Sequence, residues 1–311
     1  MTTPPATHLA ASYAAALQAA RDAAAGQHYP TGALYLVATP IGNLADISLR
    51  ALHLLQLANQ LACEDTRHSQ TLLRAYGIDK PAASWLALHQ HNEAQAAQVV
   101  IAQLRQGLRV AYVSDAGTPA ISDPGARLVA AVRAAGLRVV PLPGASSVTC
   151  VLSVAGITPD ARQDGGFVFA GFLPSKAQER AAAVQTLASE TRAVVILEAP
   201  HRIEALADAL APLGQRLLTV GRELTKQFEE IATLPAQEVP QWLQQGSHRT
   251  RGEFALVLHP APATDSAGPD TRVLALLLSE LPVKTAVRLA ADITGQSRNA
   301  LYACALAMKS A

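Results

Sequence analysis

The chain has 311 residues, of which 50% are hydrophobic and 16% are charged, and its formal net charge is +1. Such a chain can bury large cores, which argues against global disorder, and its length suits two domains with a small third unit. The near-neutral charge balance marks neither a nucleic-acid-binding protein nor an acidic one. If RNA is the partner, its basic contacts must therefore be local.

Several other broad classes of protein are disfavoured. The three cysteines, Cys63, Cys150 and Cys304, are too widely spaced for a zinc motif and suit a reducing, cytoplasmic compartment without disulfides. There is no uncharged apolar run of about 18 residues, which a membrane span would need. Residues 1–31 are rich in Ala, Thr and Pro and lack the pattern of a secretory signal, so we expect a poorly ordered extension with some helical tendency.

Short apolar runs and helical patterns alternate over residues 32–148. Asn92 and Gln95 form a capping-box pattern at the start of one helix, and Asp123-Pro124 has the pattern of another helix start. The alternation predicts right-handed βαβ units, a parallel sheet and hence an α/β domain. The expected strands are 34–38, 60–63, 108–113 and 137–142, and the expected helices are 48–57, 92–105 and 123–136.

A second α/β domain is expected over residues 149–260, with strands at 167–170, 193–197, 216–220 and 253–258 and helices at 176–189 and 201–210. The composition of residues 261–271 is that of a linker. Two amphipathic helices, 283–292 and 297–308, then flank a turn at Thr294-Gly295, which is helix-turn-helix spacing. The tail, 272–311, has five basic residues against two acidic ones. This tail could bind RNA, or it could be a small helical packing module.

Ligands of parallel α/β sheets bind beyond the carboxyl ends of the strands, and four loops occupy such positions. Residues 38–43 lack the GxGxxG pattern of dinucleotide sites, but Pro40 and Gly42 suit a tight turn near a ligand. The other three loops are 114–119, with one carboxylate; 141–147, with two serines at a helix start; and 198–202, with a charged cluster. Each could equally be a structural turn or a surface ion pair. His89 and His91 are a weak metal signal without a thiolate, so no metal is expected.

The amino-acid sequences of these loops closely resemble those of the bacterial 16S rRNA (cytidine-2′-O)-methyltransferases of the tetrapyrrole methylase superfamily. The resemblance runs in order from about residue 32 to the end of the chain. It is carried by LYLVATPIGNLADISLRAL, EDTRHSQTLL, SDAGTPAISDPG, VVPLPGASS, GFLPSK, EAPHR, RELTKQFE and GEFALVL, and by PVKTAVRLAADITGQSRNALYACAL in the tail.

This resemblance implies a tetrapyrrole methylase-like fold of two α/β domains with S-adenosylmethionine in the cleft between them, a helix-turn-helix-like tail, and a homodimer. It also implies 2′-O-methylation of a cytidine in the 16S rRNA of the small ribosomal subunit. The residues expected to bind the cofactor are Pro40, Asp115, Ala116, Gly117, Thr118, Pro143, Gly144, Ser146, Ser147, Glu198, Ala199, Phe254 and Ala255. The wider superfamily has GxGPGD where residues 38–43 stand here, and Thr-Ser where Ser146-Ser147 stand. The first departure disfavours a tetrapyrrole substrate, and the second retains small hydroxyl groups.

A ribose hydroxyl is a poor nucleophile, so a base or a positive field should assist its attack on the methyl group. Our first hypothesis for this assistance is the cluster Arg222, Glu223 and Lys226, and our second is Glu64 with its neighbours Asp65 and Arg67. The other charged candidates are His91, Glu198 and His201.

A basic path is also needed for the RNA phosphates, and the expected contacts are Arg67, Arg202, Lys284, Arg288 and Arg298. Aromatic residues make up only 4% of the chain, so the RNA should be recognised by shape rather than by broad base stacking. Two alternatives stay open. The chain could methylate a tetrapyrrole or another small molecule, or it could be a non-catalytic RNA-binding assembly factor.

Overall fold

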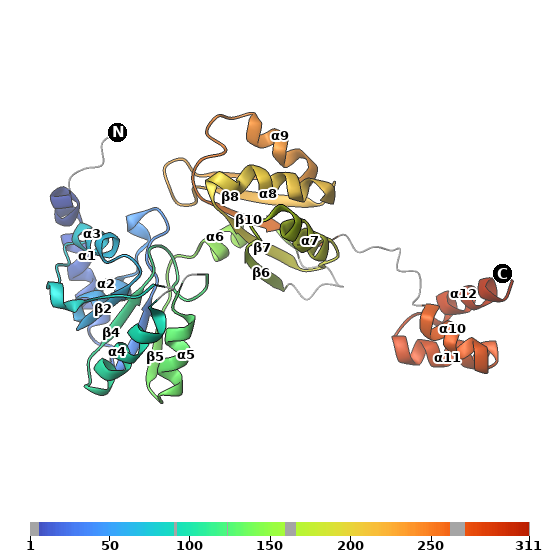
Figure 1. Cartoon of the computed structure of the whole chain (residues 1–311), viewed down its shortest axis with the longest axis horizontal. Coiled ribbons are helices and arrows are strands. Elements are labelled where there is room, and N and C mark those ends of the chain that lie inside the picture. The colour runs from blue at the N-terminus through green and yellow to red at the C-terminus, as the bar shows by residue number, and fades with distance from the viewer. Residues whose placement is uncertain (1–5, 90–91, 123, 159–165, 262–270, 311) are drawn as a thin grey trace. The chain divides into compact units, whose positions relative to one another are not determined.

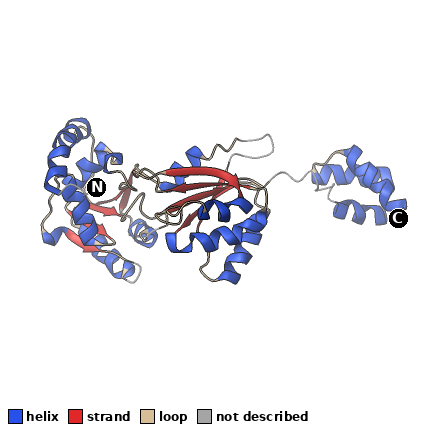
Figure 2. Ribbon diagram, turned by 90° about the horizontal axis from the view of Figure 1, so that it is seen from above, coloured by secondary structure: helices blue, strands red, loops and turns tan. Residues whose placement is uncertain are grey.

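A computed structural model describes residues 6–89, 92–122, 124–158, 166–261 and 271–310. The chain divides into two compact units, Met1–Pro260 and Ala261–Ala311, which are described separately (Figure 1). The larger unit contains two sheets, each with helices packed against it (Figure 2). None of the described helices is long and apolar enough to cross a membrane.

The first sheet has the strand order β3-β2-β4-β1-β5, and all of its pairings are parallel. The parallel sheet predicted from the alternation of elements is therefore confirmed. Its strands are β1 (Ala33–Val37), β2 (Gln60–Cys63), β3 (Trp85–Ala87), β4 (Val110–Val113) and β5 (Arg138–Leu142). The helices are α2 (Leu49–Leu57), α3 (Thr66–Ala75), α4 (Glu93–Arg105) and α5 (Ala126–Ala134). Because all the strands run the same way, the loops after them meet at one edge of the sheet.

The N-terminal segment differs from the poorly ordered extension that we expected. It forms helix α1 (Ala6–Ala24), whose side chains Leu17, Ala20 and Ala24 are buried in the same core as β1 and α2. The ring of Tyr13 also packs edge-on against Tyr76, with 5.0 Å between the ring centroids. The hydrophobicity pattern does not predict this helix because its sequence is rich in Ala. Small residues can pack closely without forming a strongly apolar stripe.

Two predicted helix starts are also wrong in detail. Asn92 is the N-cap of α4, but its side chain accepts a hydrogen bond from the backbone N–H of His89 instead of capping the helix. Helix α5 begins at Ala126 rather than near Asp123-Pro124, and Asp123 lies outside the described residues. The buried carboxylate of Glu93 caps α5 from a distance, because its Oε1 accepts the backbone N–H groups of Gly125, Arg127 and Leu128 at 3.0–3.2 Å.

The second sheet is mixed, with the order β6-β7-β10-β8-β9; β6 runs parallel to β7, and the other neighbours are antiparallel. Its strands are β6 (Phe167–Phe172), β7 (Ala193–Glu198), β8 (Leu217–Arg222), β9 (Glu230–Pro235) and β10 (Phe254–Leu258). The helices of this half are α6 (Ser147–Val154), α7 (Ala177–Ala188), α8 (Ile203–Leu210) and α9 (Val239–Gln244). Five short 3₁₀ helices complete the larger unit: Leu44–Asp46, Ala82–Ser84, Pro200–Arg202, Ala211–Leu213 and Ala236–Glu238.

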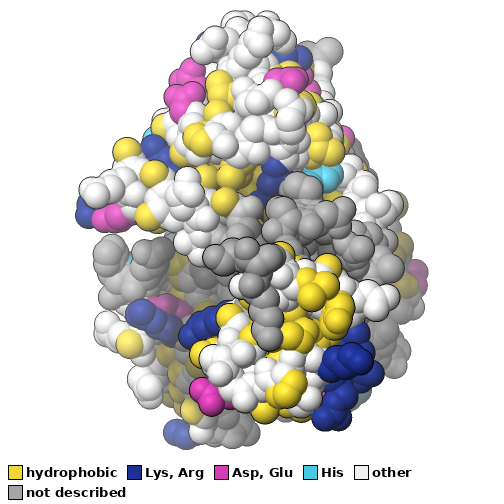
Figure 3. Space-filling view, turned by 90° about the vertical axis from the view of Figure 1, so that its right-hand side faces the viewer, with side chains coloured by type: hydrophobic (Ala, Val, Ile, Leu, Met, Phe, Trp, Pro, Cys, Tyr) yellow, Lys and Arg dark blue, Asp and Glu magenta, His cyan; other side chains and the backbone are white. Residues whose placement is uncertain are grey.

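The smaller unit contains α10 (Thr271–Glu280), α11 (Val283–Thr294) and α12 (Arg298–Ser310). Its own core includes the fully buried Leu274, Ala290, Leu301 and Ala305. Gly295 ends α11 in the left-handed region with φ 72°, a conformation that favours glycine. On the face of the molecule that Figure 3 shows, hydrophobic side chains gather beside Lys and Arg side chains. Most of the expected linker lies outside the described residues, and α10 was not predicted.

Candidate active site

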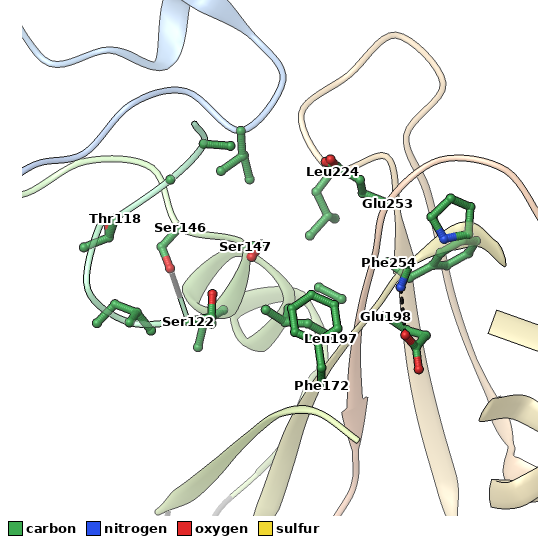
Figure 4. A pocket seen from close by; sticks show the side chains of 18 residues that line it. Thr118, Ser122, Ser146, Ser147, Phe172, Leu197, Glu198, Leu224, Glu253 and Phe254 are labelled. Carbon is green, nitrogen blue, oxygen red and sulfur yellow. Dashed lines mark hydrogen bonds between the residues drawn. The ribbon is translucent and has the colours of Figure 1, made fainter. Parts of the chain in front are cut away.

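A cavity of about 320 Å³ lies where loops of the first sheet face the second sheet (Figure 4). Small and apolar residues make up most of its wall, and among the described residues that line it only Glu198 and Glu253 are charged. It is lined by Ile41, Ala116, Gly117, Thr118, Ile121, Ser122, Ser146, Ser147, Val148, Phe172, Leu197, Glu198, Ala199, Pro200, Leu224, Glu253, Phe254 and Ala255.

Hydrogen bonds between neighbouring loops build the first wall. Thr39 and Gly117 exchange two backbone hydrogen bonds of 2.9 and 3.0 Å, which joins the loop after β1 to the loop after β4. The Thr118 hydroxyl donates to the carbonyl of Ala145 at 3.0 Å, which brings in the loop after β5. Gly117 has φ 77°, and a Cβ atom there would lie 3.2 Å from Ile41 Cγ2. These constraints explain why glycine suits this position.

The start of α6 supplies small hydroxyl groups to the same wall. Ser146 is the N-cap of α6, but its side chain does not cap the helix, so the hydroxyl is available to a ligand. In Figure 4, Ser122, Ser146 and Ser147 lie on one side of the cavity, and the apolar side chains of Phe172 and Leu197 lie on the other. The N–H groups of a helix start and the nearby hydroxyls can bind a carboxylate.

The second wall forms where β7 and β10 pair, with Phe254 opposite Glu198. The Glu198 carboxylate points away from the cavity (Figure 4) and accepts the Ala199 backbone N–H at 2.9 Å. It also pairs with Arg202 at 3.0 Å, and Arg202 in turn donates to the carbonyl of Leu173. This largely buried pair holds the loop after β6 against the loop after β7. The geometry of Arg202 thus favours a structural role over the RNA contact expected from the sequence.

Arg222 has a similar structural setting. Its side chain is almost fully buried, pairs with Glu230 at 3.3 Å and donates to the carbonyls of Phe228 and Arg251 at 2.9 and 3.3 Å. These bonds use the guanidinium to fix the turn after β8, and Arg222 does not line the cavity. The structure therefore does not favour a direct catalytic role for this arginine.

Glu223 and Lys226 belong to a network that reaches the cavity through Glu253. Lys226 Nζ donates to Glu223 Oε1 at 2.8 Å and to Glu253 Oε2 at 3.1 Å. Glu223 Oε1 also accepts the backbone N–H of Glu253 at 3.0 Å. The backbone is strained here, with φ 51° at Glu223 and 66° at Thr225. A Cβ atom on Gly42 would lie 2.3 Å from Lys226 Cγ, so the lysine stem packs directly on the loop after β1.

This network keeps Glu223 and Lys226 charged. Burial opposes the charge of Glu223, but hydrogen bonds from Lys226 and from the Glu253 backbone outweigh it and lower the pKa of Glu223. Burial likewise opposes the charge of Lys226, but hydrogen bonds to the two carboxylates raise the pKa of Lys226. Lys226 is therefore a cation at neutral pH, so it is unsuited to act as a general base.

The second catalytic hypothesis lies outside the lining of the cavity. Asp65 caps α3 by accepting the backbone N–H groups of Arg67 and His68, and these bonds, above all the one from Arg67, lower the pKa of Asp65. Arg67 is highly exposed and lies 3.5 Å from the Asp65 carboxylate. Glu64 does not line the cavity either, and His91 lies outside the described residues.

Nine of the thirteen residues expected to bind the cofactor line the cavity; Pro40, Asp115, Pro143 and Gly144 do not. Gly144 still shapes the wall, because a Cβ atom there would lie 2.8 Å from Ala38 Cβ. Nine further lining residues are not among those expected cofactor contacts: Ile41, Ile121, Ser122, Val148, Phe172, Leu197, Pro200, Leu224 and Glu253. All nine lie within or beside the motifs quoted above, so the motifs themselves were the available signal. Within the described part of the chain, no three His, Cys, Asp or Glu residues are grouped to hold a metal ion.

Comparison with known protein families identifies the class of this fold and site. The family model for Tetrapyrrole (Corrin/Porphyrin) Methylases matches residues 33–240, and the model for the RsmI C-terminal HTH domain matches residues 264–309. The chain belongs to the tetrapyrrole methylase family of S-adenosylmethionine-dependent methyltransferases, and it is an enzyme of this type. The family membership, fold class and methyl donor expected from the sequence are thereby confirmed.

Curated relatives match the chain over most of its length. The protein named ribosomal RNA small subunit methyltransferase I from Escherichia coli O157:H7 is 45% identical over 279 residues, which cover 88% of this chain and 95% of the relative. The proteins of the same name from Pseudomonas aeruginosa and Neisseria meningitidis serogroup B are 46% and 44% identical. These matches cover 88% and 94% of this chain and 97% and 98% of the relatives.

Solved structures share the fold at much lower identity. A diphthine synthase aligns with a TM-score of 0.55 at 14% identity and covers 73% of this chain and 90% of its own. A cobalt precorrin-4 methyltransferase aligns with a TM-score of 0.53 at 18% identity and covers 74% of this chain and 98% of its own. Both likenesses concern the fold alone.

Proposed function

We propose that this enzyme transfers the methyl group of S-adenosylmethionine to the 2′-hydroxyl of a cytidine in 16S rRNA. The observation that carries the proposal is the cavity between the two sheets, in a chain that matches named small-subunit rRNA methyltransferases along almost their whole length. Membership of the wider family alone would leave the acceptor open.

The lining of the cavity fits the proposed cofactor. A volume of about 320 Å³ lies in the range of small-molecule sites. The hydroxyls of Ser146 and Ser147 at the start of α6 suit the amino-acid end of the molecule, and the apolar surface around Leu197 and Phe254 suits its adenine. When bound, the cofactor supplies an electrophilic methyl group. We assign Thr118, Ala199 and Ala255 to the same binding surface.

The chain must hold the ribose hydroxyl in line with that methyl group. The residues placed to influence this region are those of the network at Glu223, Lys226 and Glu253, because Glu253 connects it to the cavity. The cation of Lys226 fixes the carboxylates rather than accepting a proton.

RNA contacts are proposed mainly for the smaller unit. Lys284 and Arg288 are exposed and four residues apart on α11, so they share one helix face. Neither has an ion pair with any residue that the structure describes. Arg298, by contrast, pairs with Asp292 at 3.0 Å. We further propose that the enzyme works as a homodimer in the cytoplasm, where the small ribosomal subunit is assembled.

The test is transfer of a labelled methyl group from S-adenosylmethionine to three acceptors: small ribosomal subunits, free 16S rRNA and porphyrinogens. We expect label in the rRNA, located by nuclease mapping at a 2′-O-methylcytidine. Label in porphyrinogens alone would show a small-molecule methyltransferase. Cofactor binding without transfer to any of the three would favour a non-catalytic assembly factor.

A further inference from the structure

Two carboxylates of the described residues, Glu198 and Glu253, line the cavity, and their surroundings differ. The carboxylate of Glu198 is fully buried, bound to Arg202 and turned away from the cavity. The Glu253 side chain is 73% exposed and extends beside Leu224 toward the opposite wall (Figure 4). Within the described part of the chain, Glu253 is thus the carboxylate at the cavity that stays exposed, although one of its oxygens pairs with Lys226.

Three features hold Glu253 in this position. Its backbone N–H is bound by Glu223 Oε1, and its carbonyl accepts the backbone N–H of Glu223 at 2.9 Å. Its Oε2 accepts from Lys226 Nζ at 3.1 Å, whereas no described residue donates a hydrogen bond to its Oε1. Gly252, at φ 91°, lets the Glu223 side chain pass, since a Cβ atom there would lie 2.5 Å from Glu223 Cγ. One oxygen of Glu253 is therefore fixed, and the other can accept a proton.

We propose that Glu253 is the proton acceptor for the ribose hydroxyl and that Lys226 is its positioning residue. This inference rests on the proposed function. As the hydroxyl oxygen forms its bond to the methyl carbon, the carbon–sulfur bond breaks and its electron pair stays on sulfur. The hydroxyl proton passes to Glu253 Oε1 and afterwards to water. The hydroxyl becomes strongly acidic as its oxygen is alkylated, so an ionised carboxylate is a sufficient base.

Lys226 serves this step by holding the carboxylate in place. Its ammonium group bridges Glu253 to Glu223, and its aliphatic stem packs on Gly42 of the loop after β1. Substitution by methionine retains most of that packing and removes the charge. Substitution by arginine retains the charge. Comparison of Lys226→Met with Lys226→Arg therefore separates the effect of the charge from the effect of packing.

The decisive variant is Glu253→Gln, which keeps the shape of the side chain but accepts a proton poorly. We expect its kcat for rRNA methylation to fall by about 10²- to 10⁴-fold. Its Kd for S-adenosylhomocysteine, measured by calorimetry, should stay within about threefold of the wild-type value. The control is Glu204→Gln, on the exposed side of α8 and away from the cavity, which should match the wild type in both measurements.

Lys226→Met should lower kcat while leaving the Kd for S-adenosylhomocysteine near the wild-type value, and Lys226→Arg should restore kcat, which a purely structural role would not produce. A Glu253→Gln enzyme with near-normal kcat would overturn the inference. So would a rise of tenfold or more in its Kd for S-adenosylhomocysteine, because that result would assign the carboxylate to cofactor binding. If the wild type binds the cofactor but methylates no rRNA, the proposed function itself is wrong.

Discussion

Gly252 shows how a single backbone position supports the cavity. Its φ of 91° lies in the region that favours glycine, and the Glu223 side chain occupies the space where a Cβ atom would stand. Glu223 in turn binds Lys226 and the backbone of Glu253. A methyl group at this position would therefore disturb the network as well as the backbone.

We expect Gly252→Ala to lower the free energy of unfolding by about 2–4 kcal/mol, from backbone strain and the clash together. The control is Gly107→Ala, with φ 80° and no atom within 4 Å of its Cβ position, where a loss of about 1 kcal/mol is expected from strain alone. Urea unfolding of both variants gives the difference. Equal losses would show that the clash with Glu223 is relieved at little cost.

Half-buried His259 gives the molecule a pH-dependent stability. Burial, together with the nearby Arg216, lowers the pKa of His259 below its ordinary 6.5, and its Nε2 lies 2.8 Å from the Thr219 hydroxyl. The unfolded chain therefore binds this proton at a higher pH than the folded chain does. Stability from this group is present above the unfolded pKa and is lost as the pH falls below it.

The free energy of unfolding should consequently decrease between about pH 7 and about pH 5, and His259→Asn should make that decrease smaller. Urea titrations at several pH values measure the effect. His68→Asn serves as the control, because its side chain is exposed on α3. If His259→Asn leaves the dependence of the free energy of unfolding on pH unchanged, this histidine is not the group responsible for it.

At the scale of elements, Glu93 links helix α4 to helix α5. The loop between β4 and α5 ends at this link. Glu93 begins α4, and its buried carboxylate accepts three backbone N–H groups at the start of α5. Glu93→Ala should cost about 2–4 kcal/mol, since the N–H groups of Gly125 and Leu128 are buried. Glu93→Gln keeps an acceptor oxygen and should cost less.

Both Glu93 variants can be measured by urea unfolding and by cofactor binding. Because the loop that α5 anchors lines the cavity, the alanine variant should also bind S-adenosylmethionine more weakly. An alanine variant as stable as the wild type would contradict this assignment.

The regular elements of the first sheet were predictable because their periodicity is local. The strands at β1, β2, β4 and β5 fall within a few residues of their expected ranges. The three-residue β3 is too short to produce a pattern, and α1 lacks a strong apolar stripe. The antiparallel pairing of β10 between β7 and β8 could not be read from the sequence, because pairing depends on contacts between distant segments.

The residues of the site were only partly predictable, for a related reason. Loop positions follow from the strand ends, and Thr118, Ser146 and Ala199, which lie in such loops, line the cavity. The sequence could not show whether a charged side chain after a strand faces a ligand or a neighbouring carbonyl. Arg202 and Arg222 bind carbonyls and carboxylates, and only their folded surroundings reveal it.

At the scale of the whole molecule, the two units have separate cores. The core of α10, α11 and α12 shares no residue with the four hydrophobic clusters of the larger unit. A chain that ends at Pro260 should therefore keep its melting temperature and its affinity for S-adenosylmethionine. Its binding to rRNA should weaken. Loss of cofactor affinity on truncation would instead give the smaller unit a structural role.

The charges of α11 allow a sharper form of this prediction. Replacing both Lys284 and Arg288 by glutamine should make the dependence of rRNA affinity on salt shallower, by about 1.4–1.8 in the log–log slope. Arg298→Gln is the control: Arg298 already pairs with Asp292, so its loss should change the slope less. An unchanged slope in the double variant would exclude phosphate contacts by this face of α11.

The pairing of β7 with β10 has a further consequence, for inhibition of the enzyme. On this wall the carboxylate of Glu198 is averted, and the side chains of Leu197, Phe254 and Ala255 offer an apolar surface to a ligand. The main chain offers little hydrogen bonding here, because the Ala199 N–H and carbonyl are bound by Glu198 and Arg202, and Ala255 lies in a strand paired on both sides. An inhibitor that binds chiefly to this wall should therefore owe its affinity to apolar contact, whereas one that binds to the serines opposite should depend on hydrogen bonds.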